Sequence, residues 1–318
     1  MTANSSNVVI GIDVSKGWID AHCLPDGKTW RVKNAPDALA EWVEKLPKDA
    51  INLIVLEATG RLHNDVTAAF VDAGMPVAII NPKRLKNFGR AFGVQAKTDK
   101  IDARTIAEFG RRMKPSPRKT PDEAQALLAE LVTRRRQLVK IRTAEKHRLT
   151  TANAKSIRKN VETLIAELEK MIDEINRQIA DHIQSDPKWI VNEKLLMSVP
   201  GVSVITARLL LGLLPELGNL SRRQIASLGG LAPFARDSGK SQGKRFVCGG
   251  RESVRSGLYM AALSASAHNP TLKLFYEHLL EKGKPKKVAL TALMRKLLTM
   301  LNAIIRDQKP WSAPQITP

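Results

Sequence analysis

The sequence predicts an α/β domain followed by a mostly helical remainder. Between residues 8 and 82, short runs rich in valine and isoleucine alternate with stretches of helical periodicity. From residue 121 onward helix-forming residues dominate. A proline-rich stretch, KPSPRKTP at residues 114–121, separates the two parts. We therefore expect a mixed sheet with flanking helices, and then an all-α region.

The elements of the first part follow one another in a recognisable order. VVIGIDVS, WIDAHCLP and KTWRVKN predict three strands linked as hairpins, and PDGK between the last two is turn chemistry. PDALAEWVEKL predicts a helix, and INLIVLEA predicts a strand buried on both faces. RLHNDVTAAFVDAG and MPVAIINP add a helix and a second buried strand. Three antiparallel strands, helix, strand, helix, strand is the order of a ribonuclease-H-like fold.

The remaining chain predicts mostly helices. Residues 83–97 predict a basic connection with partial helix, and a helix begins near Asp99. In residues 121–182 an apolar seam steps by three and four, as in a coiled coil. Its members are Val161, Leu164, Leu168, Met171 and Ile175, widened by Ile165, Ile172 and Ile179. The seam fits two alternatives, namely a helix pair packed within its own domain or a coiled coil between subunits.

The region beyond residue 186 predicts an apolar helix, a tight Pro-Gly turn, a second apolar helix, a loop and three closing helices. The sequence thus divides into residues 1–118, 119–186 and 187–318. The first would be the catalytic domain, the second a helical assembly region, and the third a mostly helical domain with a helix-hairpin-helix-like element.

Charge and composition narrow the function. The 318 residues carry a formal net charge of +20, which favours a polyanionic partner, above all nucleic acid. Two cysteines exclude a disulfide framework, and the start MTANSSNVV lacks the pattern of a secretory signal. The apolar segment near residue 290 is interrupted by Arg295 and Lys296, so we expect a packed helix and no membrane partner. The expected location is the bacterial cytoplasm, at the nucleoid.

Four acidic residues are candidates for a metal site. Asp13 ends the first predicted strand and Glu57 ends the fourth, which would pair beside it. Asp99 and Asp102 lie three residues apart at a helix start and so share a face. If that helix crosses the same sheet edge, the four carboxylates converge and require a cation, for which Mg²⁺ is suited. The alternatives are an N-cap at Asp99 and an ion pair of Asp102 with Arg104 or a neighbouring lysine.

Cations gather around several of these features and predict contacts with phosphate. The turn at Gly201 would offer backbone N–H groups to a phosphate, although a plain helical hairpin explains it equally well. The predicted nucleic-acid-binding residues are Lys97, Lys100, Arg104, Arg134, Arg135, Arg136, Gly201, Arg236, Lys240, Lys244 and Arg245.

The segments GIDVSK, LEATG, INP and KTDKIDARTIAEF, in this order, resemble the DEDD transposases of bacterial insertion sequences, the insertion-sequence one-ten family. That family also includes Piv-type DNA invertases. The resemblance implies a RuvC-like amino-terminal domain with Mg²⁺ or Mn²⁺ at Asp13, Glu57, Asp99 and Asp102. In GGLAPFARDSGKSQGKRFVCGGRESVRSGLYMAAL it implies that Ser238 is the nucleophile. Chemistry alone does not select Ser238, because Ser241 lies in the same loop.

The resemblance implies a transposase that cuts and rejoins DNA through a phosphoserine intermediate. It also implies a structured noncoding guide, a bridge RNA, and a homo-oligomer that forms dimers and tetramers on donor and target DNA. Three alternatives stay open: a site-specific invertase of the same family, a RuvC-like metal-dependent nuclease, and a DNA-binding protein without catalysis.

Overall fold

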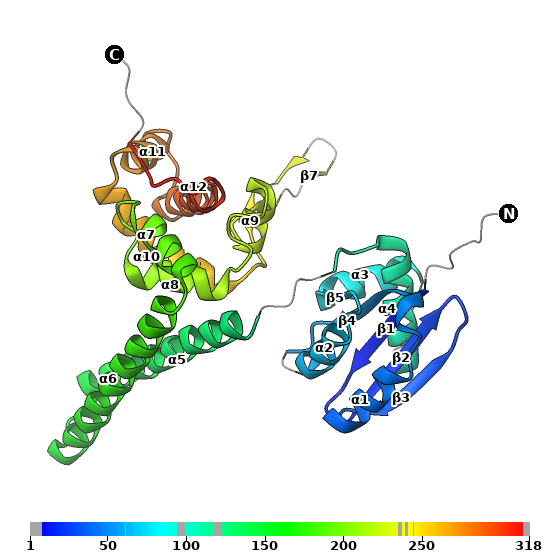
Figure 1. The fold of residues 1–318 in the computed structure, drawn as a ribbon. Coiled ribbons are helices and arrows are strands. Elements are labelled where there is room, and N and C mark those ends of the chain that lie inside the picture. Colours follow the sequence, from blue (N-terminus) through cyan, green and yellow to red (C-terminus); the bar gives the residue numbers. More distant parts are fainter. Residues whose placement is uncertain are drawn as a thin grey trace. The chain divides into compact units, whose positions relative to one another are not determined.

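The computed structural model describes residues 8–60, 62–93, 99–117, 122–234, 237–238, 241–243 and 245–313, with the backbone alone at 99–101, 237–238 and 241–242. The chain forms two compact units, Met1–Thr120 and Pro121–Pro318 (Figure 1). The finer division into three parts at residues 118 and 186 stays a prediction.

The amino-terminal unit is built on a five-stranded sheet of order β3-β2-β1-β4-β5 (Figure 1). The hairpins β1 (Val8–Val14), β2 (Trp18–Leu24) and β3 (Thr29–Lys33) are antiparallel. On the other side, β4 (Ile51–Glu57) pairs parallel with β1, and β5 (Val77–Ile80) pairs parallel with β4. This topology confirms the predicted ribonuclease-H-like fold.

Helices cover both faces of this sheet. One face packs against α1 (Pro36–Glu44) and α2 (His63–Asp72), where the rings of Trp42 and Phe70 meet edge to face at 5.4 Å. A short 3₁₀ helix, Lys48–Ala50, precedes β4. The other face packs against α3 (Pro82–Ala91) and α4 (Asp99–Met113). The predicted partial helix in residues 83–97 is α3, which Asn81 caps and Pro82 begins.

The carboxy-terminal unit begins with two long helices, α5 (Glu123–Thr151) and α6 (Lys155–Gln184), which lie side by side (Figure 1). The seam that α6 buries differs in part from the predicted one. Val161, Ile165, Leu168 and Ile172 are buried, but Leu164 and Met171 are 42% and 48% exposed. The helix pair within the chain accounts for only one side of the apolar stripe.

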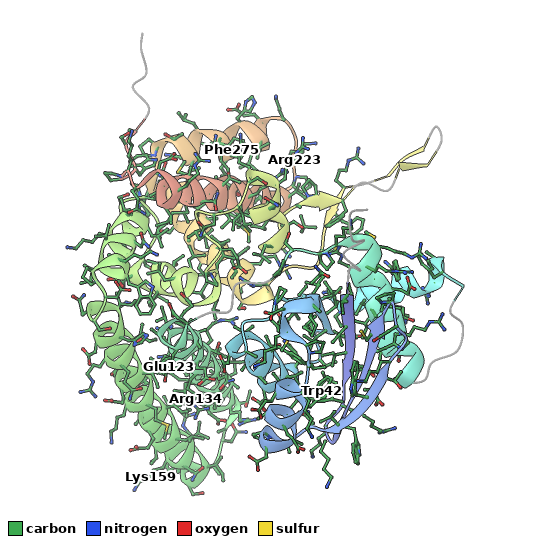
Figure 2. The ribbon with its side chains drawn as sticks, turned by 45° about the vertical axis from the view of Figure 1, so that its right-hand side comes forward. Trp42, Glu123, Arg134, Lys159, Arg223 and Phe275 are labelled. Carbon is green, nitrogen blue, oxygen red and sulfur yellow. The ribbon has the colours of Figure 1, made fainter. Side chains whose placement is uncertain are left out.

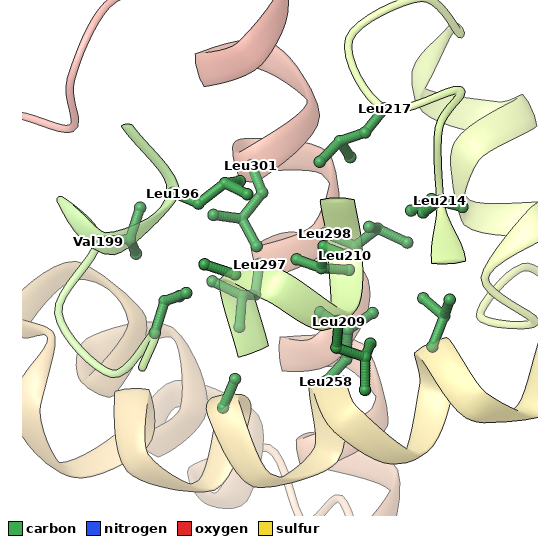
Figure 3. Packing of buried hydrophobic residues seen from close by; sticks show 14 of the residues in the cluster. Leu196, Val199, Leu209, Leu210, Leu214, Leu217, Leu258, Leu297, Leu298 and Leu301 are labelled. Carbon is green, nitrogen blue, oxygen red and sulfur yellow. The ribbon is translucent and has the colours of Figure 1, made fainter. Parts of the chain in front are cut away.

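The rest of this unit is a compact helical core. Its helices are α7 (Pro187–Met197), α8 (Val204–Leu213), α9 (Arg222–Leu228), α10 (Glu252–His268), α11 (Pro270–Glu281) and α12 (Lys286–Asp307). Leu297, Leu298 and Leu301 of α12 meet leucines of α7, α8 and α10 (Figure 3). Within the described residues, α12 alone is long and apolar enough to cross a membrane, but half of its apolar window is buried in this core. We therefore interpret it as a core helix, as the sequence predicts.

Two short ladders connect α9 to α10. β6 (Pro233–Phe234) pairs with β9 (Phe246–Val247), and β7 (Asp237–Ser238) pairs with β8 (Ser241–Gln242). The β6–β9 ladder forms the stem of this hairpin, and the β7–β8 ladder beyond it carries Ser238.

Candidate active site and nucleic-acid surface

Asp13 and Glu57 end two adjacent parallel strands at the same level. The register pairs Gly11 with Val55 and Ile12 with Leu56, so the next step along both strands brings Asp13 beside Glu57. Neighbouring strands lie about 4.8 Å apart. The structure thus brings these two predicted acids together, and both are half-buried.

A third acid, which the sequence analysis did not select, continues this row. Asp20 of β2 lies directly across the antiparallel ladder from Asp13 and is 6% exposed. Arg31 of β3 offers partial compensation, with its Nε 3.9 Å from Oδ1 of Asp20. The signal for Asp20 is present in DVSKGWID, because a tight turn at Ser15–Trp18 places positions 13 and 20 opposite each other.

The row of acids faces α4. Side chains alternate along a strand, so Asp13 shares a face with Val9, and Glu57 shares a face with Val55. Val9 and Val55 pack against Ile106 and other residues of α3 and α4. The carboxylates therefore lie on the α4 side of the sheet, at its edge.

The direction of α4 follows from two glycines. A Cβ added at Gly11 would lie 2.2 Å from N of Ala107 and 2.4 Å from O of Ala103. One turn later, a Cβ at Gly110 would meet side chains of Val9 and Val55 at 2.7 and 2.5 Å. As α4 proceeds, its contact thus moves back along β1, so the helix runs opposite to the strand. Its first turn lies toward the edge where β1 ends.

Asp102 lies in that first turn. It precedes the buried Ile106 by four residues and so shares its face, and its own side chain is half-buried. Asp99 begins α4 three residues earlier on the same side, and its side chain lies outside the described part. The backbone therefore places Asp13, Glu57 and the first turn of α4, which carries Asp99 and Asp102, toward the same edge of the sheet.

The described acids interact with other residues of the protein, and their side chains do not form a complete metal-binding site. Asp13, Glu57 and Asp102 each take part in an interaction with other residues of the protein. Among the described side chains, no group of three His, Cys, Asp or Glu residues is close enough to hold a metal ion. The N-cap alternative for Asp99 and the Arg104 pair for Asp102 stay open.

Ser238 lies in the carboxy-terminal unit, where β7 pairs it with Ser241 of β8. The two serines are register partners, so the backbone gives no reason to prefer one as nucleophile. Phe234, four residues before Ser238, belongs to the stem and stacks near Phe246 with ring centroids 6.3 Å apart. The nucleophile predicted from the resemblance is therefore carried on a short ladder beyond an aromatic stem.

The arginines predicted to bind phosphate differ in how exposed their side chains are. Arg104 and Arg134 are exposed, and Figure 2 labels Arg134 on α5. Arg135 is half-buried and donates from Nε to Oδ1 of Asn176 at 2.5 Å. Burial, together with the nearby positive charges of Arg142 and Arg208, lowers the pKa of Arg135, and its contact with α6 gives it a structural role.

The other predicted contacts are only partly described. Arg136 lines a small cavity beside Arg135 and Arg208, and Arg245 is exposed. The side chain of Lys100 and the whole of Lys97, Arg236, Lys240 and Lys244 lie outside the described residues.

The turn at Gly201 has a packing explanation. Its φ of +100° favours glycine, and a Cβ there would lie 2.5 Å from both N and Cα of Ala265 in α10. Ser203 caps α8 by accepting from the N–H of Thr206. A role of this turn in phosphate binding stays a prediction.

A ribonuclease-H-like sheet with carboxylates gathered where β1 and β4 end, joined to a basic helical unit, defines the class of enzymes that cut and transfer nucleic-acid strands. The family comparison gives the particular group. Residues 10–152 match the model of a DEDD transposase of the IS110 type, described as "Transposase". Residues 193–277 match "Transposase IS116/IS110/IS902 family". The chain belongs to this family and is a DNA transposase or recombinase.

Individual relatives agree with this assignment. The pilin gene-inverting proteins of Moraxella lacunata and Moraxella bovis are each 30% identical over 96% of this chain and 98% of their own length. A protein of insertion element IS900 from Mycobacterium paratuberculosis is 30% identical over 46% of this chain and 38% of its own. Among solved structures, RuvC of T. thermophilus with a Holliday junction substrate matches 35% of this chain and 98% of its own, at 19% identity and a TM-score of 0.28.

Proposed function

We propose that this chain recombines DNA by a serine-based mechanism, with Ser238 as nucleophile and with Asp13, Glu57, Asp99 and Asp102 as ligands of a divalent cation. The observation that carries the proposal is the row of carboxylates across β2, β1 and β4, with Asp102 on the crossing helix. Like charges directly opposite each other destabilise a sheet. Such a row therefore favours a cation as its counter-charge.

The donor set fits a hard cation. Carboxylate oxygens are the ligands that Mg²⁺ and Mn²⁺ accept, and the acids come from separate elements that the sheet and α4 hold in place. A cation bound there would polarise the scissile phosphate and stabilise the charge on the leaving oxygen. Asp20 adds negative charge beside Asp13 and, with Arg31, would fix the direction of that carboxylate.

Ser238 performs the bond exchange in this proposal. Its Oγ loses a proton and bonds to phosphorus, and the bond from phosphorus to the DNA leaving oxygen breaks. That oxygen takes up a proton and becomes a free hydroxyl, while the strand stays attached to Ser238 as a phosphodiester. A hydroxyl of a second strand then reverses the exchange at phosphorus and releases Ser238. The phosphoserine link conserves the bond energy, so no nucleotide cofactor is required.

We also propose a structured guide RNA and an assembly of several subunits. The net charge of +20 with only 4% aromatic residues favours phosphate contacts over base stacking across most of the surface. Assembly is supported by α6, on which Ile157, Leu164 and Met171 are exposed at heptad spacing. Such a stripe suits a second helix from another subunit.

The decisive experiment is capture of the covalent intermediate. Labelled DNA carrying the ends of the element that encodes this chain, with RNA transcribed from its flanking segment, is incubated with protein and Mg²⁺. We expect wild type and Ser241→Ala to retain label after denaturation, with mass spectrometry placing the nucleotide on Ser238. Ser238→Ala, Asp13→Asn and EDTA should each abolish the adduct. An adduct formed by Ser238→Ala would refute the assignment, and cleavage without any adduct would indicate a simple nuclease.

A site-specific invertase is the second candidate. It is favoured by the match to pilin gene-inverting proteins over nearly their whole length. A plasmid with two inverted copies of the recombination site distinguishes the activities. Inversion of the intervening segment supports an invertase, whereas insertion of the element into a second plasmid supports a transposase.

A further inference from the structure

A large cavity in the carboxy-terminal unit lies beside the stem of the Ser238 hairpin. Its volume is about 830 Å³, and its walls come from α9, α11, α12 and the β6–β9 ladder. Arg223 of α9 and Phe275 of α11, both labelled in Figure 2, mark two of these walls. We call it the α12 cavity, because seven of its lining residues belong to that helix.

The rim of the α12 cavity is strongly cationic. Six basic side chains line it, and Asp and Glu are absent from the described lining: Arg222, Arg223, Arg245, Lys287, Arg295 and Lys296. Apart from Arg245, none of these cations forms an ion pair with an acid among the described residues. The remaining five cations favour an anionic ligand with several charges.

The lining also includes apolar side chains, which we call the apolar floor of the cavity. Leu231, Phe246, Val247 and Val288 contribute to it, and Lys296 lies 4.2 Å above the ring of Phe275. The phosphates of a duplex would contact the cations, but its bases are stacked inside and would leave the apolar floor without a partner. An unpaired base supplies a flat apolar face together with a neighbouring phosphate, so it satisfies floor and rim at once.

The cavity also continues in one direction. A second hollow shares Arg222, Lys296 and Thr299 with it and extends along α12 to Arg306. A strand whose base occupies the α12 cavity can therefore extend along α12 over the shared Arg222 and Lys296 toward Arg306, which is itself paired with Asp307. This continuity fits a chain of nucleotides better than a single small anion.

The position relative to Ser238 suggests what the bound nucleotide does. Phe234 and Phe246 face each other in the stem, and Ser238 follows Phe234 by four residues. Four extended residues span at most about 14 Å, which corresponds to about four steps of stacked DNA. A nucleotide in the cavity therefore lies within a few positions of any phosphate that Ser238 reaches.

We propose that the α12 cavity binds an unpaired nucleotide of single-stranded DNA that flanks the scissile phosphate. This inference rests on the proposed serine chemistry for its location, but the binding itself does not depend on that chemistry. The base lies on the apolar floor between Phe246 and Val288, and the adjoining phosphates contact the cationic rim. Holding one base out of the duplex would fix the strand for attack.

The test uses the full chain in EDTA, so that binding is measured without cleavage. The probe is fluorescein-labelled oligothymidylate of about ten nucleotides, followed by anisotropy. Val288→Trp fills the cavity from an exposed position of α12 without changing charge. We expect it to weaken binding about tenfold, the equivalent of one lost stacked base. Its matched control is Leu274→Trp, an exposed site on α11 outside the lining, which should stay within about twofold of wild type.

Charge is tested separately. Arg223→Glu on the rim should weaken oligothymidylate binding more than Lys159→Glu on α6, and equal losses would overturn the proposal in favour of general attraction to a basic protein. Unchanged binding by Val288→Trp, or equal losses with Leu274→Trp, would also overturn it. Tighter binding of oligouridylate than of oligothymidylate by more than about tenfold would overturn the choice of DNA.

Failure of this inference and failure of the serine chemistry have different signatures. If the Ser238 adduct forms but Val288→Trp binds the oligonucleotide normally, the cavity assignment is wrong and the serine assignment stands. If Val288→Trp loses binding and no adduct forms, the cavity assignment stands and the serine assignment is wrong.

Discussion

Replacing Gly11 with alanine should displace α4, and with it the proposed metal ligand Asp102, while adding only one methyl group. The new Cβ would lie 2.2 Å from N of Ala107, 2.4 Å from O of Ala103 and 2.7 Å from Cα of Ala107, whereas ordinary contacts begin at 3.4 Å. All three atoms belong to the backbone of α4, so no side chain can turn aside. The helix must move by about 1 Å, and Asp102 moves with it. A displacement of this size costs on the order of a hundredfold in rate when it misplaces a reacting group.

Overpacking of a tight contact typically costs about 1–3 kcal/mol, so the variant should remain folded if the unit has ordinary stability. The assay measures urea unfolding and adduct formation on the same preparations. The matched control is Gly110→Ala on the same helix, where the three atoms nearest the new Cβ belong to the side chains of Val9 and Val55 and not to backbone. We expect the control to lose stability but to retain most of its activity. If Gly11→Ala matches wild type in both measurements, the close crossing of α4 over β1 is wrong.

Two further predictions concern assembly and pH. Leu164→Gln combined with Met171→Gln should weaken self-association about tenfold in sedimentation experiments at unchanged stability, since both side chains are exposed. The control Ile165→Gln, at a buried position, should instead lower the free energy of unfolding by about 2 kcal/mol. Dimerisation that survives the double substitution would contradict a role for the exposed stripe of α6. Burial raises the pKa of the Cys23 thiol to about 12, so between about pH 9 and pH 12 the unfolded chain releases this proton while the folded chain keeps it. The free energy of unfolding should therefore fall more steeply with rising pH in this window than it does for Cys23→Ala, and iodoacetamide should modify the exposed Cys248 first.

The sheet could be predicted because its pattern is local. Each strand is a short apolar run, each turn has its own residues, and the order of elements then permits few topologies. The same logic placed Asp13 and Glu57 side by side, since both end strands that must be parallel neighbours. Asp20 was recoverable in principle from the hairpin register, but a single polar residue inside a strand has too many ordinary explanations to be selected without the structure.

Other features depend on which surfaces meet, and the sequence does not contain that information in readable form. A stripe with steps of three and four covers two sides of α6, and only packing shows that α5 takes Leu168 and Ile172 and leaves Leu164 and Met171 exposed. The need for glycine at position 11 arises from a helix some ninety residues later. The cations of the α12 cavity are spread from Arg222 to Lys296, so no single basic segment of the sequence predicts that they lie together.

The parallel pairing of β1 with β4 affects the order in which this edge of the sheet forms during folding. Asp13 and Glu57 are separated by 43 residues of chain, and Asp102 follows much later. During synthesis the first hairpins form before any of these acids can meet, because contacts distant in sequence form late. A chain made only as far as β4 therefore carries Asp13 and Glu57 but lacks α4 and Asp102. The order of the elements thus leaves the edge where β1 and β4 end incomplete until α4 has been made and has packed across the sheet.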